Sequence, residues 1–226
     1  MLSKRLMAVL DYIGPNERIV DVGCDHGYLA KAAIEKGVKY VQLVDNKRMP
    51  LARAKENLSS MEKEAHVIYT LASGLTSVTE EITVACICGM GGDLIASILE
   101  ESKGQAQRLH YLLLQPNTKV DHLRAYLSQN AFAILDEQWI AEKEKYYPIL
   151  KVQYISDTAP LTPLEIAYGP CLLRHPSDTF IAYLKRRMGE LNVIIETMDQ
   201  SNKDYERIFL QIKEIEEVLN GIKENH

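Results

Sequence analysis

The sequence predicts an α/β fold, in which helices cover both faces of a doubly wound parallel sheet, followed by a C-terminal helical hairpin. Short apolar segments of strand length alternate with helix-like segments through the first two thirds of the chain, which is the rhythm of βαβ units. Most of these segments are apolar throughout, as expected for strands that are covered on both faces. After residue 157, prolines punctuate the chain and only helical periodicity follows.

The strands and helices of the sheet are expected in a regular order. Pro50 lies near the start of one expected helix, where its fixed φ angle suits the first turn. The last two strands have no helix between them, so we expect them to pair in antiparallel fashion. Strands are predicted at 18–23, 40–45, 66–71, 83–88, 109–115, 132–141 and 148–155, and helices at 28–37, 48–61, 92–103 and 118–130.

The C-terminal part carries two stripes of apolar residues at steps of three and four, separated by the polar residues 200–202. Such stripes are typical of two helices that pack as an antiparallel, coiled-coil-like hairpin. We therefore divide the chain into a catalytic-size domain at 1–160 and a linker with the hairpin at 161–226. The stripes consist of Ile181, Leu184, Met188, Leu191, Ile195 and Met198, and of Tyr205, Ile208, Ile212, Ile215, Leu219 and Ile222.

Composition narrows the classes of protein that need to be considered. A chain of 226 residues with 46% hydrophobic content buries one good core with a modest appendage. A net charge of -5 excludes a polycation that coats nucleic acid unselectively. The four cysteines fit neither a disulfide framework nor a zinc site, and no metal is expected. Neither a membrane span nor a secretory signal is predicted, so the expected compartment is the reducing cytoplasm.

The turn after the first predicted strand indicates what kind of ligand the sheet binds. Ligands of open α/β sheets sit at the carboxyl ends of the strands, and a dinucleotide site carries G-x-G-x-x-G there. This turn has Gly23, Asp25 and Gly27 instead, and Asp21 precedes them in the strand. A carboxylate ~4 Å from a phosphate costs about 4 kcal/mol at an effective dielectric constant of 20. A diphosphate is therefore the wrong ligand.

S-adenosylmethionine fits this pattern, because it carries an ammonium and a sulfonium where NAD carries phosphates. Asp45 closes the second strand, where an acid accepts hydrogen bonds from ribose hydroxyls. These acids also have a structural interpretation, Asp21 and Asp25 as turn residues and Asp45 as a helix cap. His26 is expected to be a hydrogen-bonding partner in the turn rather than a general base.

Two further turns follow strands on the same side of the sheet. The glycine-rich segment 89–92 lets the backbone approach a bound group closely and leaves helix amides available. Gln115 and Asn117 flank Pro116, and their amides offer both a donor and an acceptor to the edge of a planar base. A plain strand-to-helix turn explains this second segment equally well.

Four motifs together resemble the bacterial tRNA (adenine(22)-N1)-methyltransferase family, TrmK. They are LSKRL at 2–6, VDVGCDHGYL at 20–29, GMGG at 89–92 and LQPN at 114–117, in this order and spacing. The similarity extends through the C-terminal hairpin. It implies a class I methyltransferase domain with a Rossmann-like sheet, and an enzyme that transfers the methyl group of S-adenosylmethionine to N1 of an adenine in the D-arm of tRNA.

The resemblance also implies which residues bind the cofactor. Residues 21–27 line its methionine end, Asp45 holds the ribose, and 89–92 closes the pocket. Where the family tends to have Gly-Asp-Gly-Leu, this chain has Ala-Ser-Gly-Leu at 72–75, so Ser73 or a backbone group replaces an acid that accepts from the adenine amine. The expected cofactor-binding residues are Asp21, Gly23, Cys24, Asp25, His26, Gly27, Asp45, Asn46, Ser73, Gly74, Gly89, Met90 and Gly91.

Catalysis is expected at Asp25, Gln115 and Asn117. Adenine N1 needs no strong base to attack a methyl group, but the product ring is cationic, so a nearby acceptor stabilises it. Alignment of the reacting atoms is the enzyme's main contribution, and it requires no metal. The adenine is expected to turn out of its stack toward Pro116 and Tyr147. Core or rim packing is an equal interpretation of Tyr147.

Contact with tRNA is expected from local clusters of positive charge. The candidates are Lys4 with Arg5, and Lys185 with Arg186 and Arg187. For any one cluster taken alone, a solvated helix surface is the favoured interpretation. Two other functions stay open, a methyltransferase for a substrate other than tRNA and a non-catalytic adaptor with the same fold. The sequence does not indicate an oligomeric state. A monomer is compatible with each of these functions.

Overall fold

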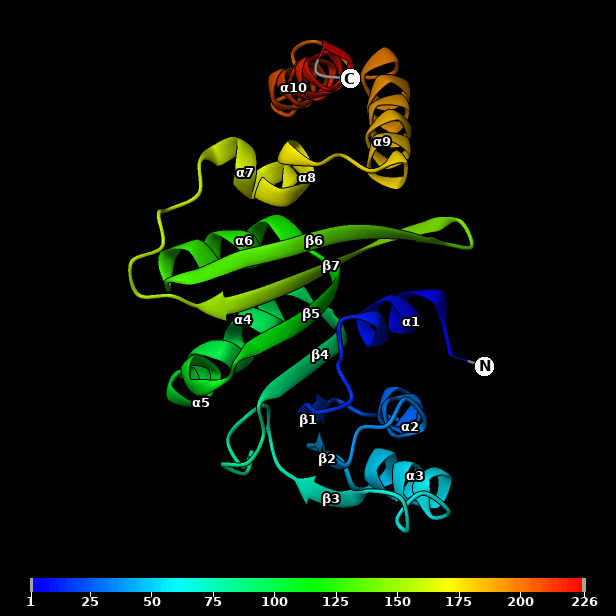
Figure 1. The fold of residues 1–226 in the computed structure, drawn as a ribbon. Helices are drawn as coiled ribbons and strands as arrows, with labels where there is room; N and C mark the ends of the chain where they lie inside the picture. The colour runs from blue at the N-terminus through cyan, green and yellow to red at the C-terminus, as the bar shows by residue number, and fades with distance from the viewer. Residues whose placement is uncertain (1, 225–226) are drawn as a thin grey trace. The chain divides into compact units, whose positions relative to one another are not determined.

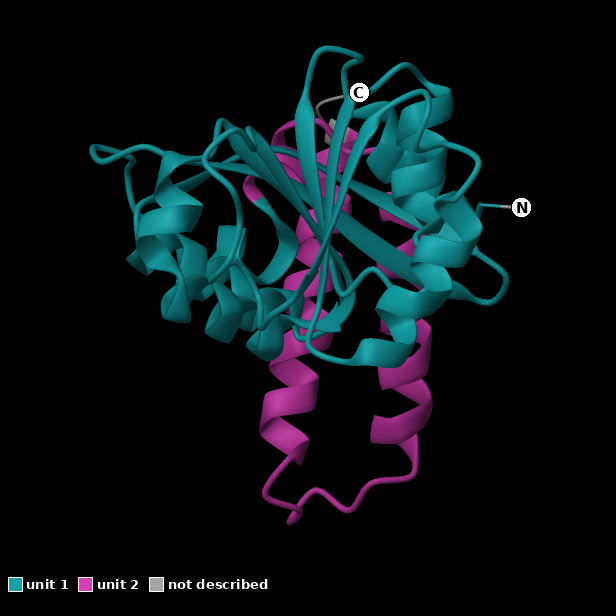
Figure 2. Ribbon diagram, turned by 90° about the horizontal axis from the view of Figure 1, so that it is seen from below, with its two compact units in different colours: residues 1–169 teal, residues 170–226 magenta. Residues whose placement is uncertain are grey.

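The computed structural model describes residues 2–224. The chain divides into two compact units, residues 1–169 and 170–226 (Figure 2). Helix α7 (Pro163–Tyr168), which our division at residue 160 assigned to the C-terminal part, lies in the first unit. It is held there because the Arg124 guanidinium donates to the carbonyl oxygens of Ile166 and Ala167, at 3.2 and 3.0 Å.

The first unit contains a seven-stranded sheet in the order β3-β2-β1-β4-β5-β7-β6 (Figure 1). The first five strands are parallel, and β7 is antiparallel to both of its neighbours. The predicted α/β sheet and its terminal antiparallel pair are therefore confirmed. The strands are β1 (Arg18–Val22), β2 (Tyr40–Asp45), β3 (His66–Leu71), β4 (Val84–Gly91), β5 (Tyr111–Thr118), β6 (Phe132–Glu142) and β7 (Lys145–Tyr154).

Helices cover both faces of this sheet (Figure 1). One face carries α1, α2 and α3, and the other carries α4, α5 and α6. Helix α1 was not predicted. The Ser3 hydroxyl caps it by accepting from the Leu6 amide, and it buries Ala8 and Val9. The helices are α1 (Lys4–Asp11), α2 (Tyr28–Glu35), α3 (Arg48–Leu58), α4 (Gly92–Glu101), α5 (Lys103–Arg108) and α6 (Val120–Gln129).

Strands β4 and β5 extend beyond their predicted ends at residues 88 and 115. They continue because the two segments pair with each other, Met90 opposite Pro116 and Gly91 opposite Thr118, with irregularities in the register. The glycine-rich segment and the Gln-Pro-Asn segment are therefore neighbouring strand ends rather than separate loops. The reversal of strand order falls between β1 and β4, which is the position where ligands of such sheets bind.

The second unit contains α8 (Pro170–Arg174), α9 (Asp178–Glu196) and α10 (Tyr205–Glu224). The two long helices pack against each other as the predicted hairpin. The Ser177 hydroxyl begins α9 by accepting from the Phe180 amide. Both predicted apolar stripes are buried or half-buried, and their most buried members are Leu184, Leu191, Ile208, Ile212, Ile215, Leu219 and Ile222.

Candidate active site

A cleft of about 430 Å³ lies in the first unit at the carboxyl ends of β1, β4 and β5. Its walls come from the N-terminal segment, the turn after β1 and the ends of the other two strands. It occupies the switch in strand order where a ligand is expected. Its lining consists of Leu2, Ser3, Arg5, Leu6, Asp21, Gly23, Cys24, Asp25, His26, Tyr28, Leu29, Cys88, Gly89 and Gln115.

Asp21 places a buried carboxylate in this lining. It is only 5% exposed, and among the described residues no donor bonds its side chain. Burial, together with the nearby charge of Asp45, raises the pKa of Asp21 to about 7. A buried acid without a partner is costly when ionised, so this position favours a ligand that brings positive charge.

The turn after β1 is built around left-handed backbone. Gly23 and Gly27 have φ angles of 74° and 67°, and a Cβ atom at Gly23 would approach the Met90 methyl group to 2.3 Å. Only glycine fits these positions without strain. Asp25 lies between them at φ 40°, a conformation that is costly for a residue with a side chain and that clusters at functional sites.

Asp25 and His26 place a carboxylate and an imidazole side by side in the cleft lining. The Asp25 Oδ1 atom lies 3.7 Å from His26 Nε2 and 4.0 Å from Arg53 Nη1, and the Asp25 side chain is 67% exposed. The His26 carbonyl accepts from the Asn57 amide at 3.0 Å, which ties the turn to α3. The carboxylate therefore remains accessible to a ligand.

Gln115 and Asn117 hold Gly89 through a closed set of hydrogen bonds. Gln115 is fully buried; its Oε1 accepts from the Gly89 amide at 3.1 Å, and its Nε2 donates to the Pro116 carbonyl and to Asn117 Oδ1, both at 3.1 Å. Asn117 Nδ2 donates to the Gly89 carbonyl at 2.7 Å. Gly89 has φ 78°, and an added Cβ would have no atom within 4 Å. Its Cα thus borders open space in the cleft.

Arg5 joins the N-terminal helix to this wall of the cleft. Its Nη1 donates to Asn117 Oδ1 at 3.1 Å, and its guanidinium carbon lies 4.8 Å from the centre of the Tyr147 ring. Its Nε lies 4.0 Å from a Glu142 carboxylate oxygen. Lys4 contributes its backbone amide to Glu142 and does not line the cleft. The two members of this predicted basic pair therefore occupy different environments.

The remaining predicted residues lie around the cleft without lining it. Asp45 ends β2, and its Oδ1 accepts from the Lys47 amide at 2.9 Å. The N-cap residue of α3 is Lys47, so Asp45 is not the helix cap that its structural interpretation assumed. Gly74 has a φ angle of 56° and packs on Ile98. The predicted residues outside the lining are Lys4, Gly27, Asp45, Asn46, Ser73, Gly74, Met90, Gly91, Pro116, Asn117 and Tyr147.

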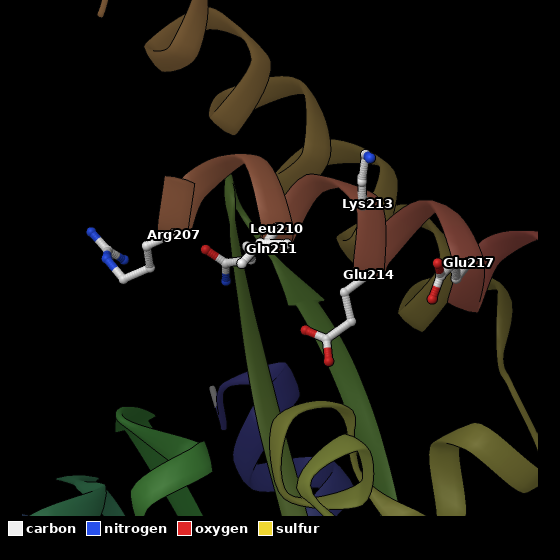
Figure 3. Close-up of a pocket in the computed structure, with 6 residues that line it drawn as sticks. All are labelled: Arg207, Leu210, Gln211, Lys213, Glu214 and Glu217. Carbon is white, nitrogen blue, oxygen red and sulfur yellow. The ribbon is translucent and has the colours of Figure 1, made fainter. Parts of the chain in front are cut away.

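The predicted basic cluster of α9 lies in the second unit and is partly neutralised. Arg186 Nε lies 3.0 Å and Arg187 Nη1 lies 3.6 Å from carboxylate oxygens of Glu190. Lys185 is exposed. The same unit has an open hollow of about 610 Å³ on one face of α10 (Figure 3), which is lined by Arg207, Leu210, Gln211, Lys213, Glu214 and Glu217. Because this lining comes from a single helix, the hollow is a helix surface rather than a cleft.

Sequence reasoning missed two parts of the cleft. Leu2, Ser3 and Leu6 were seen only as part of a motif, because nothing in a short amphipathic segment shows where it docks. Tyr28 was passed over as the first residue of a helix. It is 51% exposed, and its ring stacks on His26 with centroids 5.3 Å apart and planes at 22°. A large aromatic residue directly after a glycine turn was the available signal.

Two kinds of site are not found in the part of the chain that the structure describes. Within residues 2–224 no group of three or more His, Cys, Asp or Glu side chains is placed to hold a metal ion. No helix of that same range is both long and apolar enough to cross a membrane.

Comparison with known proteins agrees with this geometry. The family model of TrmK, tRNA (adenine(22)-N(1))-methyltransferase, matches residues 19–220. The chain belongs to the TrmK family. The tRNA (adenine(22)-N(1))-methyltransferase of Bacillus subtilis (strain 168) is 28% identical, and the match covers 99% of this chain and 96% of that protein.

Solved structures of similar proteins extend the TrmK likeness to the whole fold. Sp1610 of Streptococcus pneumoniae in complex with S-adenosyl-L-methionine is 31% identical, with a TM-score of 0.86 over 97% of this chain and 100% of that chain. M. capricolum TrmK in complex with the cofactor product S-adenosyl-homocysteine is 27% identical, with a TM-score of 0.86 over 98% and 99% of the two chains. The predicted family, fold, enzyme class and tRNA methyltransferase activity are confirmed.

Proposed function

We propose that the cleft between β1, β4 and β5 is where this chain methylates N1 of adenine 22 in tRNA, with S-adenosylmethionine as its cofactor. One observation carries the assignment of the site. Asp21 is a buried carboxylate without a donor to its side chain among the described residues, and it lines a cleft at the switch in strand order. A cationic ligand removes the cost of that burial.

The residues present fit S-adenosylmethionine. Asp21 and Asp25 would hold its positively charged methionine end, and Asp45 would accept hydrogen bonds from its ribose. Gly89 leaves room where any side chain would intrude, because its Cα borders open space. When bound, the cofactor supplies an electrophilic methyl group on a sulfonium. Ser73, or a backbone group of the same turn, would accept a hydrogen bond from its adenine amine.

The wall formed by β5 and α1 receives the target base. Gln115 uses both of its amide hydrogens and its oxygen within the protein, so it acts by holding Asn117 and Gly89 in place. Asn117 keeps one Nδ2 hydrogen for the base, since its other hydrogen donates to Gly89. Pro116 and Tyr147 belong to the same wall, Pro116 between Gln115 and Asn117 and Tyr147 through the Arg5 guanidinium on its ring.

Asp25 stabilises the charge that develops on the adenine ring. Its carboxylate is largely exposed in the cleft lining, and a preorganised negative charge favours the cationic product more than the neutral substrate. No strong base is needed, so His26 serves to hold the Asp25 carboxylate. Because N1 of a stacked base is out of reach of a buried methyl group, the adenine turns out of its stack to enter the cleft.

Positively charged residues, most of them outside the cleft, complete the proposal. Lys4 and Arg5 in the first unit, and the basic cluster 185–187 in the second, contact the phosphates of tRNA. The residues that line the cleft all belong to the first unit. The four cysteines are free thiols, as expected of a protein of the reducing cytoplasm.

Primer extension tests the reaction directly. The protein is incubated with S-adenosylmethionine and a tRNA that carries adenine at position 22, and the RNA is then copied. N1 methylation blocks Watson-Crick pairing, so the copy is expected to stop at that position. A matched tRNA with guanosine at position 22 is the control. Full-length copies from both RNAs, or the same stop in both, would contradict the proposal.

A further inference from the structure

We propose that Tyr28 is the stacking face for the target adenine, and that its ring stabilises the positive charge that methylation creates. The proposal rests on the assignment of the cleft as the methylation site. Tyr28 begins α2 immediately after the glycine turn and lines the cleft. Neither the motifs nor the reaction as described above gives it a role.

The exposure of Tyr28 is the first observation. It is 51% exposed, although it stands at the lining of a cleft next to the buried Leu29 and Ala30 of the same helix. Its hydroxyl has no hydrogen-bond partner among the described residues. A large ring that contributes neither to the core nor to a polar network is available to a ligand.

The second observation is the orientation of the ring. The His26 imidazole stacks on it at 5.3 Å between centroids and 22° between planes, and the His26 carbonyl is held by Asn57 of α3. Tyr28 is therefore supported from one side by a ring on an anchored turn. A planar base adds to such a stack at little entropic cost, because the receiving ring is already oriented.

Tyr147, the aromatic residue that the sequence suggested for stacking, is less suited to it. The Arg5 guanidinium lies over its ring at 4.8 Å and is itself bound to Asn117. That face of Tyr147 is therefore occupied within the protein. The exposed aromatic surface in the cleft lining belongs to Tyr28.

Because the product is positively charged, Tyr28 affects the rate of methyl transfer as well as the binding of the adenine. Before the reaction the adenine is neutral, and afterwards it carries a positive charge on the ring. The face of a tyrosine ring attracts cations, so the stack strengthens as the charge develops. Interactions that are stronger in the transition state raise kcat, and the carboxylate of Asp25, three residues earlier, acts on the same charge.

The test compares Tyr28→Leu with Tyr28→Phe. We expect Tyr28→Leu to lower the single-turnover rate of methyl transfer at saturating tRNA by roughly tenfold or more, since stacking on a base is worth several-fold to over a hundredfold. Tyr28→Phe should stay within about threefold of the wild type, because the hydroxyl has no partner. The affinity for S-adenosylmethionine, measured by calorimetry, should change by less than about threefold in both.

Tyr40 offers a matched control. It also packs on a histidine, His66, with centroids 4.8 Å apart, but it begins β2 at the opposite end of the strands from the cleft. Tyr40→Leu should leave the rate of methyl transfer unchanged. Equal rates for the wild type and Tyr28→Leu would overturn the proposal, and so would an equal loss in Tyr28→Phe and Tyr28→Leu.

A second variant keeps the test decisive if Tyr28→Leu fails to fold. Tyr28→Trp retains a stacking face and adds a fluorophore, and its emission should be quenched on tRNA binding beyond the change that Trp139 shows in the wild type. The absence of additional quenching contradicts the stack. A wild-type protein that gives no primer stop at adenine 22 would instead refute the methylation site itself, so the two failures are distinguishable.

Discussion

Replacing Asp21 with asparagine should make the protein more stable and less able to bind its cofactor. The pKa of this buried carboxyl is raised from 3.8 to about 7, so ionised Asp21 is disfavoured in the folded state relative to the unfolded chain. The folded state binds the proton more tightly, and the free energy of unfolding therefore falls as pH rises from about 4 to about 7 and is level above that. Asparagine has nearly the same shape and no charge to bury.

The size of the stability change follows from the rise in the pKa of Asp21. About three pH units at 1.36 kcal/mol each correspond to a cost on the order of 4 kcal/mol above pH 7. At pH 5 the folded carboxyl is already protonated, and the cost is only about 2 kcal/mol. Asp21→Asn should therefore raise the free energy of unfolding at both pH values, and by more at pH 8 than at pH 5.

Urea unfolding of the cofactor-free protein at pH 5 and pH 8, with calorimetric titration of S-adenosylmethionine, measures both effects. Asp11→Asn is the matched control, because Asp11 is an exposed acid at the end of α1 and its replacement should change stability by less than about 0.5 kcal/mol. The reasoning is refuted if Asp21→Asn is no more stable than the wild type at pH 8, or if it binds S-adenosylmethionine as tightly.

Three further outcomes are expected. Gln115→Leu, which frees the Gly89 amide, should lower the single-turnover rate about tenfold or more while the protein stays folded; an unchanged rate would remove Gln115 from the positioning role. Arg124→Met leaves the buried Glu137 carboxylate without the guanidinium 2.7 Å away, so urea unfolding should show a loss of about 3–5 kcal/mol, and adding Glu137→Leu should recover much of it. Alanine at all three positions of 185–187 should reduce the slope of log affinity for tRNA against log salt by about one per lost phosphate contact, and an identical slope would exclude this cluster from the tRNA surface.

The parts of the fold that could be predicted are those whose pattern is local. Strands β2 and β3 have the limits that their segments indicated, because a short run of mostly apolar residues is a local signal. The hairpin helices followed from a helical period sustained over several turns. The extension of β4 to Gly91 could not be predicted, since it depends on pairing with a strand more than twenty residues away.

The candidate site also has one part that the local sequence predicts and one part that depends on residues far away in the chain. The turn at 21–27 was predictable because a glycine pattern and its acids lie within seven residues. The wall opposite was not, because Arg5 reaches Asn117 across 112 positions of sequence and nothing near Arg5 distinguishes it from a surface cation. Lys4, its neighbour in the chain, is also a cation in the first turn of α1, yet it does not line the cleft. Tertiary docking of α1 decides which of them lines the cleft.

Residues whose burial, backbone angle or exposure is unfavourable identify the ligand better than residues in ordinary surroundings do. Asp21 is a buried acid without a donor to its side chain among the described residues, Asp25 has a left-handed φ angle, and Tyr28 exposes half of a large ring. Each is unfavourable in the cofactor-free protein, and such conflicts are expected at functional sites. A positively charged amino-acid end offsets the charges of Asp21 and Asp25, and a planar base covers the exposed ring of Tyr28, so one pair of ligands accounts for all three residues. A dinucleotide would leave both acids facing phosphates, which is why the same sheet here serves methyl transfer.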